Sequence, residues 1–342
     1  MKFDFKMLLV GAVIIVVLAV VFLRGDQLVQ LSETIQQGSL IPLMAAVLTQ
    51  LCKYFSQSFG YSFCFEAVGE RMDPRTTLPL VFGTFFTNTV APSLNLAGMS
   101  LVVDDARRRG IEPGKASSAA LLMQITIDGA FMLLMIVGLA ITVPAAHMSP
   151  LWFIPAVVVV FLVAAMVAIM FLGHKNPRLL LKVLHPIERL VNRVLGLIKR
   201  PPMEPWAKRV IDMFSDAAGL ILRNPKPAVK AYGCSLFASL CELACFSLVG
   251  VSFGVKAGGV LLCGYIIATL FAMVSLTPQG VGFSEAAVVV AFTAFGQTAA
   301  AGTAIGLVYR GIVFWLPFLI GAILITRTKT FRREKDLPDI EE

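Results

Sequence analysis

Five charged residues stand inside long apolar runs of the chain: Lys53, Asp128, Glu242, Glu285 and Arg310. All except Glu285 lie 11 or 12 residues into their runs. In a helix that spacing corresponds to roughly 17–18 Å, near the middle of a hydrocarbon core about 30 Å thick. A charge at that depth is expensive, so each of these residues is a candidate for function. We therefore predict a shared polar centre that binds a charged ligand, with structural salt bridging as the alternative role.

A glycine-rich segment precedes Glu285 and contains Pro278, Gly280 and Gly282 at alternate positions. Glycine removes the side chains that would keep a ligand away from the backbone. The helix expected after this segment would present free N–H groups and the positive end of its dipole, both of which favour an anion. Glu285 falls in the first helical turn, where a negative charge is stabilised. We predict that it either pairs with a base such as Arg310 until a phosphate displaces it, or caps the helix permanently.

The elements that must position these residues are membrane helices. Of the 342 residues, 57% are hydrophobic and 15% are charged, and the mean hydropathy is +0.82. Soluble domains are about 45–50% apolar and about 25% charged. The composition excludes a disordered chain, a collagen-like fibre and a disulfide-rich secreted scaffold, and it disfavours a soluble enzyme. Several runs exceed the roughly 18 residues that indicate a bilayer-spanning helix. The apolar stretches cover residues 7–23, 41–65, 79–103, 116–141, 151–172, 231–254, 259–297 and 299–326.

The stretch at residues 79–103 is interrupted in its middle by residues that favour turns or end helices: Asn88, Pro92, Asn95 and Gly98. Basic loops flank this stretch on both sides, so a single crossing would leave one basic loop outside the cell. A re-entrant hairpin would keep both loops in the cytoplasm. A membrane-spanning helix kinked by glycine and proline is the alternative.

The stretch at residues 259–297 is too long for one helix and is broken at the glycine-rich segment. With both broken stretches as hairpins, about six full spans remain, both termini are cytoplasmic, and 25 of the 29 Lys and Arg residues lie inside. Each half then contains span, span, hairpin and span, an inverted repeat whose broken segments indicate a transporter's binding site. In this repeat Lys53 matches Glu242, and Asp128 matches Arg310. The predicted fold is an all-α polytopic membrane protein.

A long insertion at residues 173–230 of the second repeat carries 12 Lys and Arg residues against four acidic residues. Four of the basic residues recur at near-helical spacing among apolar ones: Arg178, Lys182, Arg189 and Arg193. This pattern predicts an amphipathic helix on anionic lipid of the cytoplasmic leaflet, or a solvated cytoplasmic helix. No recognised motif supports binding of nucleic acid. The predicted units are a first repeat at residues 1–145, a second repeat at 146–326 and a cytoplasmic tail at 327–342.

Signals for a metal or a cofactor are weak. The six cysteines lie in apolar runs without a CxxC pair, and the three histidines are far apart in the sequence. Asp104 and Asp105 could bind a divalent cation in a membrane-embedded transferase. Because three arginines follow them closely, a solvated loop is the commoner structure for such a sequence. The chain also lacks a P-loop. We therefore expect no cofactor, no resident metal and no direct use of ATP.

One set of residues in each half carries a resemblance to a known family: Asn88, Pro92, Gly98 and Asp128, then Pro278, Gly280, Gly282, Glu285, Tyr309, Arg310, Trp315 and Pro317. Their order resembles the lysylphosphatidylglycerol synthase/flippase transmembrane family over essentially the whole chain. The chain departs from the family pattern at Gln124, where many relatives carry an acid, and at Gln279, where many carry glycine. No aminoacyltransferase domain follows within the 342 residues, so we expect no synthesis of lysylphosphatidylglycerol by this chain.

The resemblance implies a lipid flippase of the bacterial inner membrane, without enzymatic activity. Its substrate would be a phospholipid or a polyprenyl-phosphate-linked lipid, and a homo-oligomer is compatible with the sequence. The expected roles are phosphate neutralisation by Arg310 and Lys53, backbone binding at Gly280 and Gly282, hydrogen bonding by Asn88 and Asn95, and charge balance or proton relay by Glu285, Asp128 and Glu242. The alternatives are a secondary transporter for a small soluble anion and a transferase acting on a lipid-linked sugar.

Overall fold

The computed structural model describes residues 38–90, 95–142, 222–274, 280 and 282–327, together with isolated positions between residues 156 and 221. Every regular element within this part of the chain is a helix. Several predicted features lie outside the described residues: the first span at 7–23, Pro92, Pro278, most of the span at 151–172 and the tail after residue 327.

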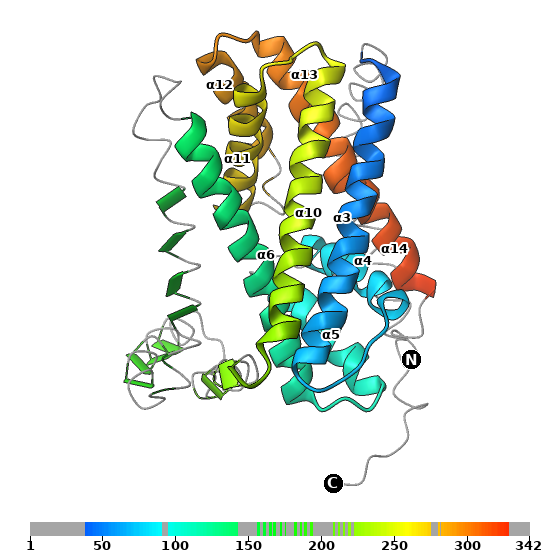
Figure 1. Cartoon of the computed structure of the whole chain (residues 1–342), viewed down its shortest axis with the longest axis vertical. Helices are drawn as coiled ribbons and strands as arrows, with labels where there is room; N and C mark the ends of the chain where they lie inside the picture. Colours follow the sequence, from blue (N-terminus) through cyan, green and yellow to red (C-terminus); the bar gives the residue numbers. More distant parts are fainter. Residues whose placement is uncertain are drawn as a thin grey trace.

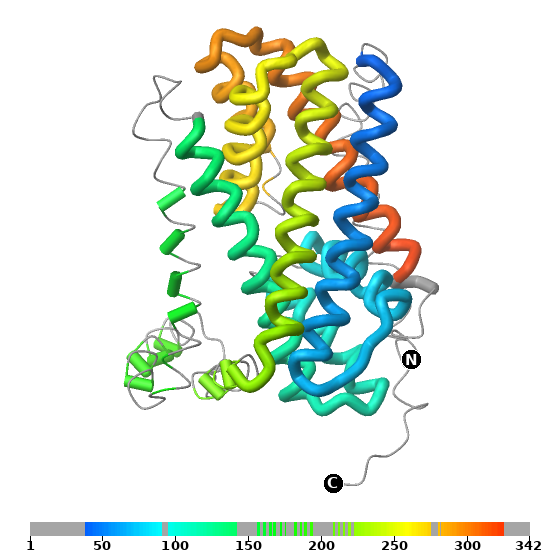
Figure 2. The backbone as a smooth tube through the Cα atoms, in the orientation of Figure 1, coloured from blue at the N-terminus to red at the C-terminus, as the bar shows by residue number. Residues whose placement is uncertain are grey.

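Three helical stretches are long and apolar enough to cross a membrane: Pro113–Ile141, Pro225–Ser252 and Ala299–Leu324. They belong to α6 (Pro113–Thr142), to α10 (Pro225–Ser252), and to one long rod made of α13 (Ala299–Arg310), the π-helical segment η4 (Gly311–Trp315) and α14 (Leu316–Arg327) (Figure 2). The chain is therefore a membrane protein, as its composition predicted.

The start predicted for α10 at residue 231 is six residues too late, because the helix begins at Pro225. Proline suits the first turn of a helix, where its missing N–H has no intrahelical partner to lose. The last residues assigned to the basic insertion are therefore part of α10. Within the insertion, Lys182, Arg189 and Arg193 are helical and exposed, while the apolar residues expected on the opposite face lie outside the described residues.

Helix α3 (Leu40–Ala67) packs antiparallel against α10 along most of its length at the front of the molecule (Figure 1). The backbone N–H of Ser39 donates to the carbonyl of Ser252 at 3.0 Å, at one end of the pair. The hydroxyl of Ser56 donates to the carbonyl of Cys234 at 2.7 Å, further along it. These two helices form the central support to which the other helices attach.

Each of the two interrupted stretches forms a pair of helices. Residues 79–90 fall in α4 (Pro74–Val90) and 96–103 in α5 (Leu96–Arg108), while the second stretch includes most of α11 (Gly258–Val274) and all of α12 (Phe283–Ala294). The α4–α5 pair lies at the lower end of the molecule and the α11–α12 pair at the upper end (Figure 1). A buried apolar cluster surrounds each pair, with Phe65 and Val102 in the lower one and Phe246 and Phe292 in the upper one.

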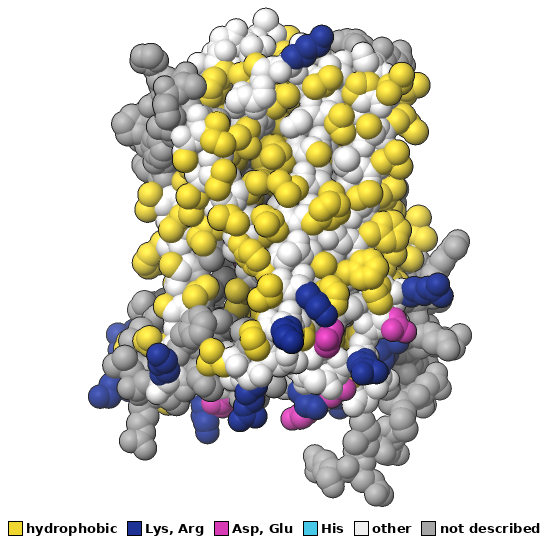
Figure 3. Space-filling view, viewed as in Figure 1, with side chains coloured by type: hydrophobic (Ala, Val, Ile, Leu, Met, Phe, Trp, Pro, Cys, Tyr) yellow, Lys and Arg dark blue, Asp and Glu magenta, His cyan; other side chains and the backbone are white. Residues whose placement is uncertain are grey.

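Charged side chains are concentrated at the lower end, while apolar side chains cover the middle of the molecule (Figure 3). The lower end carries the turns after α3 and α5, whose basic residues include Arg71, Arg107, Arg108 and Arg109. At the upper end Lys256, between α10 and α11, is the one charged residue among those described. The molecule therefore has one strongly basic end and one nearly uncharged end, separated by an apolar band.

The two halves contain left-handed backbone conformations at matching places. After α3 and α10 lie Gly69 and Gly254, with φ angles of 81° and 84°. Before α5 and α12 lie Asn95 and Gly280, with φ angles of 68° and 70°. After α5 and α12 lie Gly110 and Gly296, with φ angles of 80° and 74°. The offset between partners is 185, 185 and 186 residues. The halves thus share an order of turns although their side chains differ.

Applied along the chain, this offset gives residue matches that differ from those predicted by depth in the membrane. It pairs Gln57 with Glu242 and Gln124 with Arg310. Lys53 and Asp128, the partners expected from sequence, each lie four residues from the matching position, or about one helical turn away. Depth alone does not distinguish successive turns, which explains the difference.

Candidate functional site

A cavity of about 780 Å³ lies between the two helix pairs, and helices from α3 to η4 contribute to its wall. Eight of the residues predicted for the site line it: Lys53, Asn88, Asn95, Gly98, Asp128, Glu242, Tyr309 and Arg310. All four charges predicted at mid-depth are therefore brought to one place. They come from α3, α6, α10 and α13, four helices that are separated in the sequence.

Two of these charges, Lys53 and Glu242, form an ion pair between α3 and α10. Their side chains are 15% and 18% exposed. The hydroxyl of Tyr265 also lies 3.4 Å from the second carboxylate oxygen of Glu242. Within the cavity wall, Glu242 of α10 thus compensates the charge of Lys53, so that less of this charge is available to a ligand.

Arg310 makes the second ion pair, with Glu285 at the start of α12. The Nε atom of Arg310 lies 3.3 Å from Oε1 of Glu285, and Oε2 accepts a hydrogen bond from the backbone N–H of Gly282 at 2.7 Å. Glu285 therefore caps α12 and pairs with Arg310 at the same time, which joins the two alternatives predicted for it. The Arg310 guanidinium also lies 5.1 Å from the centre of the Phe314 ring.

Asp128 is held by an amide and not by a base. Nε2 of Gln124 lies 2.9 and 2.8 Å from the two carboxylate oxygens of Asp128, one turn along α6. Among the residues that the structure describes, Asp128 makes no ion pair. It is therefore the acid of the cavity that is available to a positive group.

The α4–α5 pair is joined by a hydrogen bond across its break. Oδ1 of Asn88 accepts from the backbone N–H of Gly98 at 2.7 Å, which satisfies a free donor in the first turn of α5. A Cβ atom at Gly98 would lie 2.6 Å from Nδ2 of Asn88, so the contact requires glycine. Gly280 has a similar requirement, since a Cβ atom there would lie 2.3 Å from Cα of Ala272. In each helix pair, the residues on the two sides of the break therefore pack closely against each other.

The π-helical segment η4 begins directly after Arg310 and was not predicted. Pro317 lacks the N–H that would bond to the carbonyl of Val313, and its ring would clash with that carbonyl in a regular α-helix. A local widening of the helix relieves this conflict, and such widenings are frequent at functional sites. The sequence signal that could have predicted this widening was Pro317, a proline four residues after the apolar Val313.

Several uncharged polar residues of the cavity wall were not predicted: Tyr54, Gln57, Tyr61, Thr84, Gln124 and Ser239. Three of them were within reach of the predicted charges by helical spacing. Gln57 follows Lys53 by four residues, Gln124 precedes Asp128 by four, and Ser239 precedes Glu242 by three. A polar residue one helical turn from an intramembrane charge was thus the signal that could have predicted these parts of the cavity wall.

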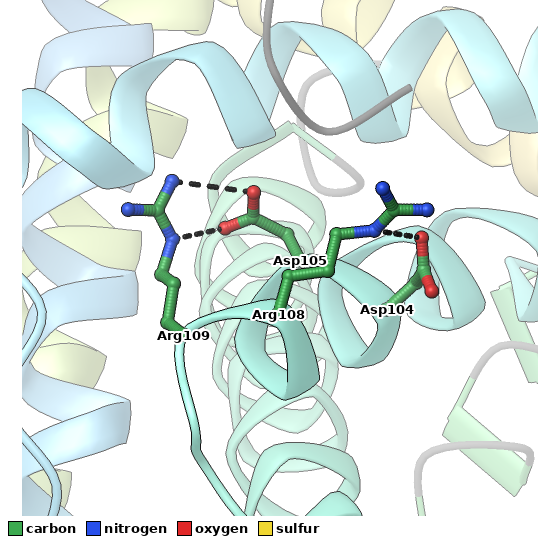
Figure 4. Close-up of polar contacts among 4 residues, drawn as sticks. All are labelled: Asp104, Asp105, Arg108 and Arg109. Atoms are coloured by element: carbon green, nitrogen blue, oxygen red, sulfur yellow. Dashed lines mark hydrogen bonds and ion pairs between the residues drawn. The ribbon is translucent and has the colours of Figure 1, made fainter. Parts of the chain in front are cut away.

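Asp104 and Asp105 do not form an open metal site, because each acid is paired with an arginine one turn later in the chain (Figure 4). Nε of Arg108 lies 3.0 Å from Asp104, and Arg109 contacts both oxygens of Asp105, at 2.7 and 3.2 Å. Within the described residues no group of three His, Cys, Asp or Glu side chains could hold a metal ion.

Two apolar residues of the cavity lining are exposed, and we refer to them as the apolar mouth. Leu96 and Met273 line the cavity and are 59% and 39% exposed, and their neighbours Val274 and Phe283 are exposed as well. The first turn of α5 and the last turn of α11 both lie near the middle of the molecule's height (Figure 1). A charged interior thus meets the surroundings within the apolar band.

Together these features define an all-helical membrane protein with a charged cavity between two broken helix pairs. The family described as "Lysylphosphatidylglycerol synthase TM region" has a sequence model that matches residues 8–321. The chain belongs to this family, as its motifs predicted. Comparison with curated proteins gives no match. Membership supports a role connected with membrane lipid.

Proposed function

We propose that the protein is a lipid transporter that moves a phosphate-bearing lipid between the leaflets of the membrane, without enzymatic activity. The observation that supports this most strongly is the combination of a charged cavity with an apolar mouth at Leu96 and Met273. A headgroup could enter the cavity while its acyl chains remain in the bilayer. A transporter for a soluble anion would instead need a mouth that opens to water.

The arrangement of the helix pairs supports two re-entrant hairpins. The chain enters α4 and leaves α5 at the basic end, and it enters α11 and leaves α12 at the opposite end (Figure 1). We assign the basic end to the cytoplasm of a bacterial cell, because basic loops are retained there. With the spans at residues 7–23 and 151–172, this gives six full spans and two hairpins.

The matching left-handed turns support an inverted repeat. Chains that fold in the same order from opposite sides place their broken segments at the centre of the membrane. Asn95 is the N-cap residue of α5, and Gly280 lies two residues before Gly282, the N-cap residue of α12. Both helix N-termini then contribute partial positive charge to the centre of the bilayer.

Arg310 is the residue we assign to the phosphate. Its counter-ion Glu285 does not line the cavity, whereas Glu242, the counter-ion of Lys53, does. Arginine also matches the geometry of phosphate oxygens. Asp128 would face any positive group of the same headgroup. Lys182, Arg189 and Arg193 are exposed and would bind anionic lipid at the cytoplasmic surface.

The test is purified protein in vesicles that contain a trace of a headgroup-labelled phospholipid, whose transfer between leaflets is followed by quenching from outside. Wild-type protein should accelerate the transfer, and Arg310→Ala should reduce the acceleration at least tenfold at equal reconstitution. Uptake of inorganic phosphate is measured in parallel. Phosphate uptake without lipid transfer would replace this proposal with the soluble-anion transporter.

A further inference from the structure

We propose that Glu285 is a built-in counter-anion that keeps the affinity of the Arg310 site low, so that a bound phosphate group can leave. This inference rests on the proposed function, because it assumes that Arg310 binds the phosphate. It assigns Glu285 a role beyond capping α12. The ligand class concerned is any phosphate group, whether it is free or part of a lipid headgroup.

The first support is that one carboxylate uses the two groups that an anion would use. Oε2 of Glu285 accepts the N–H of Gly282 at 2.7 Å, and Oε1 lies 3.3 Å from Nε of Arg310. A helix N-terminus and a guanidinium are both preferred partners of phosphate oxygens. Glu285 therefore compensates part of the positive charge that a phosphate would otherwise meet.

The second support is that Glu285 and Arg310 approach the site from different sides. Arg310 and Ser284 line the cavity, whereas Glu285 is not part of its wall. Arg310 therefore reaches the cavity, while its carboxylate partner is not part of the lining. A phosphate in the cavity can contact Arg310 without a clash with Glu285, and the two anions then share one positive charge. Sharing weakens each interaction, and it speeds dissociation of the ligand.

The third support is that the backbone fixes this arrangement. Helices α12 and α13 are in close contact at Gly302, where a Cβ atom would lie 2.9 Å from Cα of Val289. The two helices that carry Glu285 and Arg310 therefore pack backbone against backbone. Since the distance between the charged residues is set by the scaffold, the carboxylate remains near the guanidinium when the ligand is absent or present.

The test uses Glu285→Gln, because glutamine keeps an oxygen that can accept the Gly282 N–H and removes only the charge. The probe is dioctanoyl phosphatidic acid, titrated calorimetrically into full-length protein in nanodiscs. We expect Glu285→Gln to tighten binding by about tenfold, the effect of removing one competing charge-assisted contact. It should slow lipid transfer in vesicles. Asp104→Asn, which neutralises an acid outside the cavity, should change neither quantity.

The outcomes separate this inference from the proposed function. If Arg310→Ala leaves probe binding unchanged, the phosphate site itself is misassigned and the proposed function loses its main residue. If Arg310→Ala weakens binding while Glu285→Gln leaves it equal or weaker, only the counter-anion role is overturned. The thermal midpoint of each variant is measured first. A Glu285→Gln protein that is fully folded and binds no more tightly contradicts the inference.

Discussion

Lys53 and Glu242 join α3 to α10 by an ion pair inside the cavity wall. The two helices run antiparallel and support the rest of the fold. A charge pair in this position contributes specificity of packing as well as compensation of charge, since either charge alone would be strongly unfavourable.

Removing one member of this pair should therefore cost more than removing both charges. We expect Lys53→Met to lower stability by about 3–5 kcal/mol, because it leaves Glu242 uncompensated. The double variant Lys53→Met/Glu242→Gln should recover most of the loss, since glutamine can still accept from Tyr265. The measurement is thermal unfolding of the purified protein in detergent, followed by size-exclusion chromatography. Equal loss in the single and double variants would contradict this account.

Gly98→Ala should disturb the α4–α5 pair, because the new Cβ atom would lie 2.6 Å from the Asn88 amide. Loss of the hydrogen bond between Asn88 and the Gly98 N–H should cost about 1–3 kcal/mol. Gly233→Ala on α10 is the matched control, since nothing lies within 4 Å of the added Cβ atom there. The control should be neutral or stabilising by up to about 1 kcal/mol. Unfolding midpoints that fall equally in both variants would argue against the role given to Asn88.

Surface labelling tests the two hairpins. In a background without native cysteines, single cysteines at Arg71 and Glu112 should react with a membrane-impermeant maleimide from the same side of the membrane. A cysteine at Lys256 should react from the other side, because Lys256 lies at the opposite end of the molecule. Reaction of positions 71 and 112 from different sides would show that α4 and α5 together cross the membrane once.

The apolar mouth should matter for lipid and not for free phosphate. Leu96→Asp places a charge at the mouth and should slow lipid transfer at least fivefold, while binding of inorganic phosphate stays within twofold of wild type. Leu133→Asp is a suitable control because Leu133 is 41% exposed on α6 and does not line the cavity. Both variants carry the cost of a charge in the membrane. If both slow transfer equally, the mouth has no special role.

The sequence predicted the intramembrane charges and the two breaks because both depend on local rules. A charge in an apolar run and a proline or glycine in a helix are visible without any knowledge of packing. The partner of each charge was harder to predict from the sequence. Lys53 pairs with a residue 189 positions later, and within the described part of the chain Asp128 is held by Gln124 and not by a base. Such partners depend on which helical faces meet, and an error of one turn changes the answer.

The irregular backbone was the other part that sequence reasoning could not reach. The widening at η4 follows from the position of Pro317 relative to a packed helix, and a proline in a membrane helix has several structural outcomes. Asn95 adopts a left-handed conformation that only a small fraction of non-glycine residues adopt. Its role became visible only beside Gly280, which has nearly the same φ angle at the matching place.

Asn95 and Gly280 hold nearly the same left-handed conformation with different side chains. Asparagine and glycine are the residues that most readily accept a left-handed φ, so either can hold the turn. Selection on such a protein would preserve the direction of the chain at a few turns, while the residues between these turns could change. If the two halves arose by duplication, the positions of their left-handed turns would be the evidence that remains. A search by backbone torsion angles would then detect relatives that a search by residue identity overlooks.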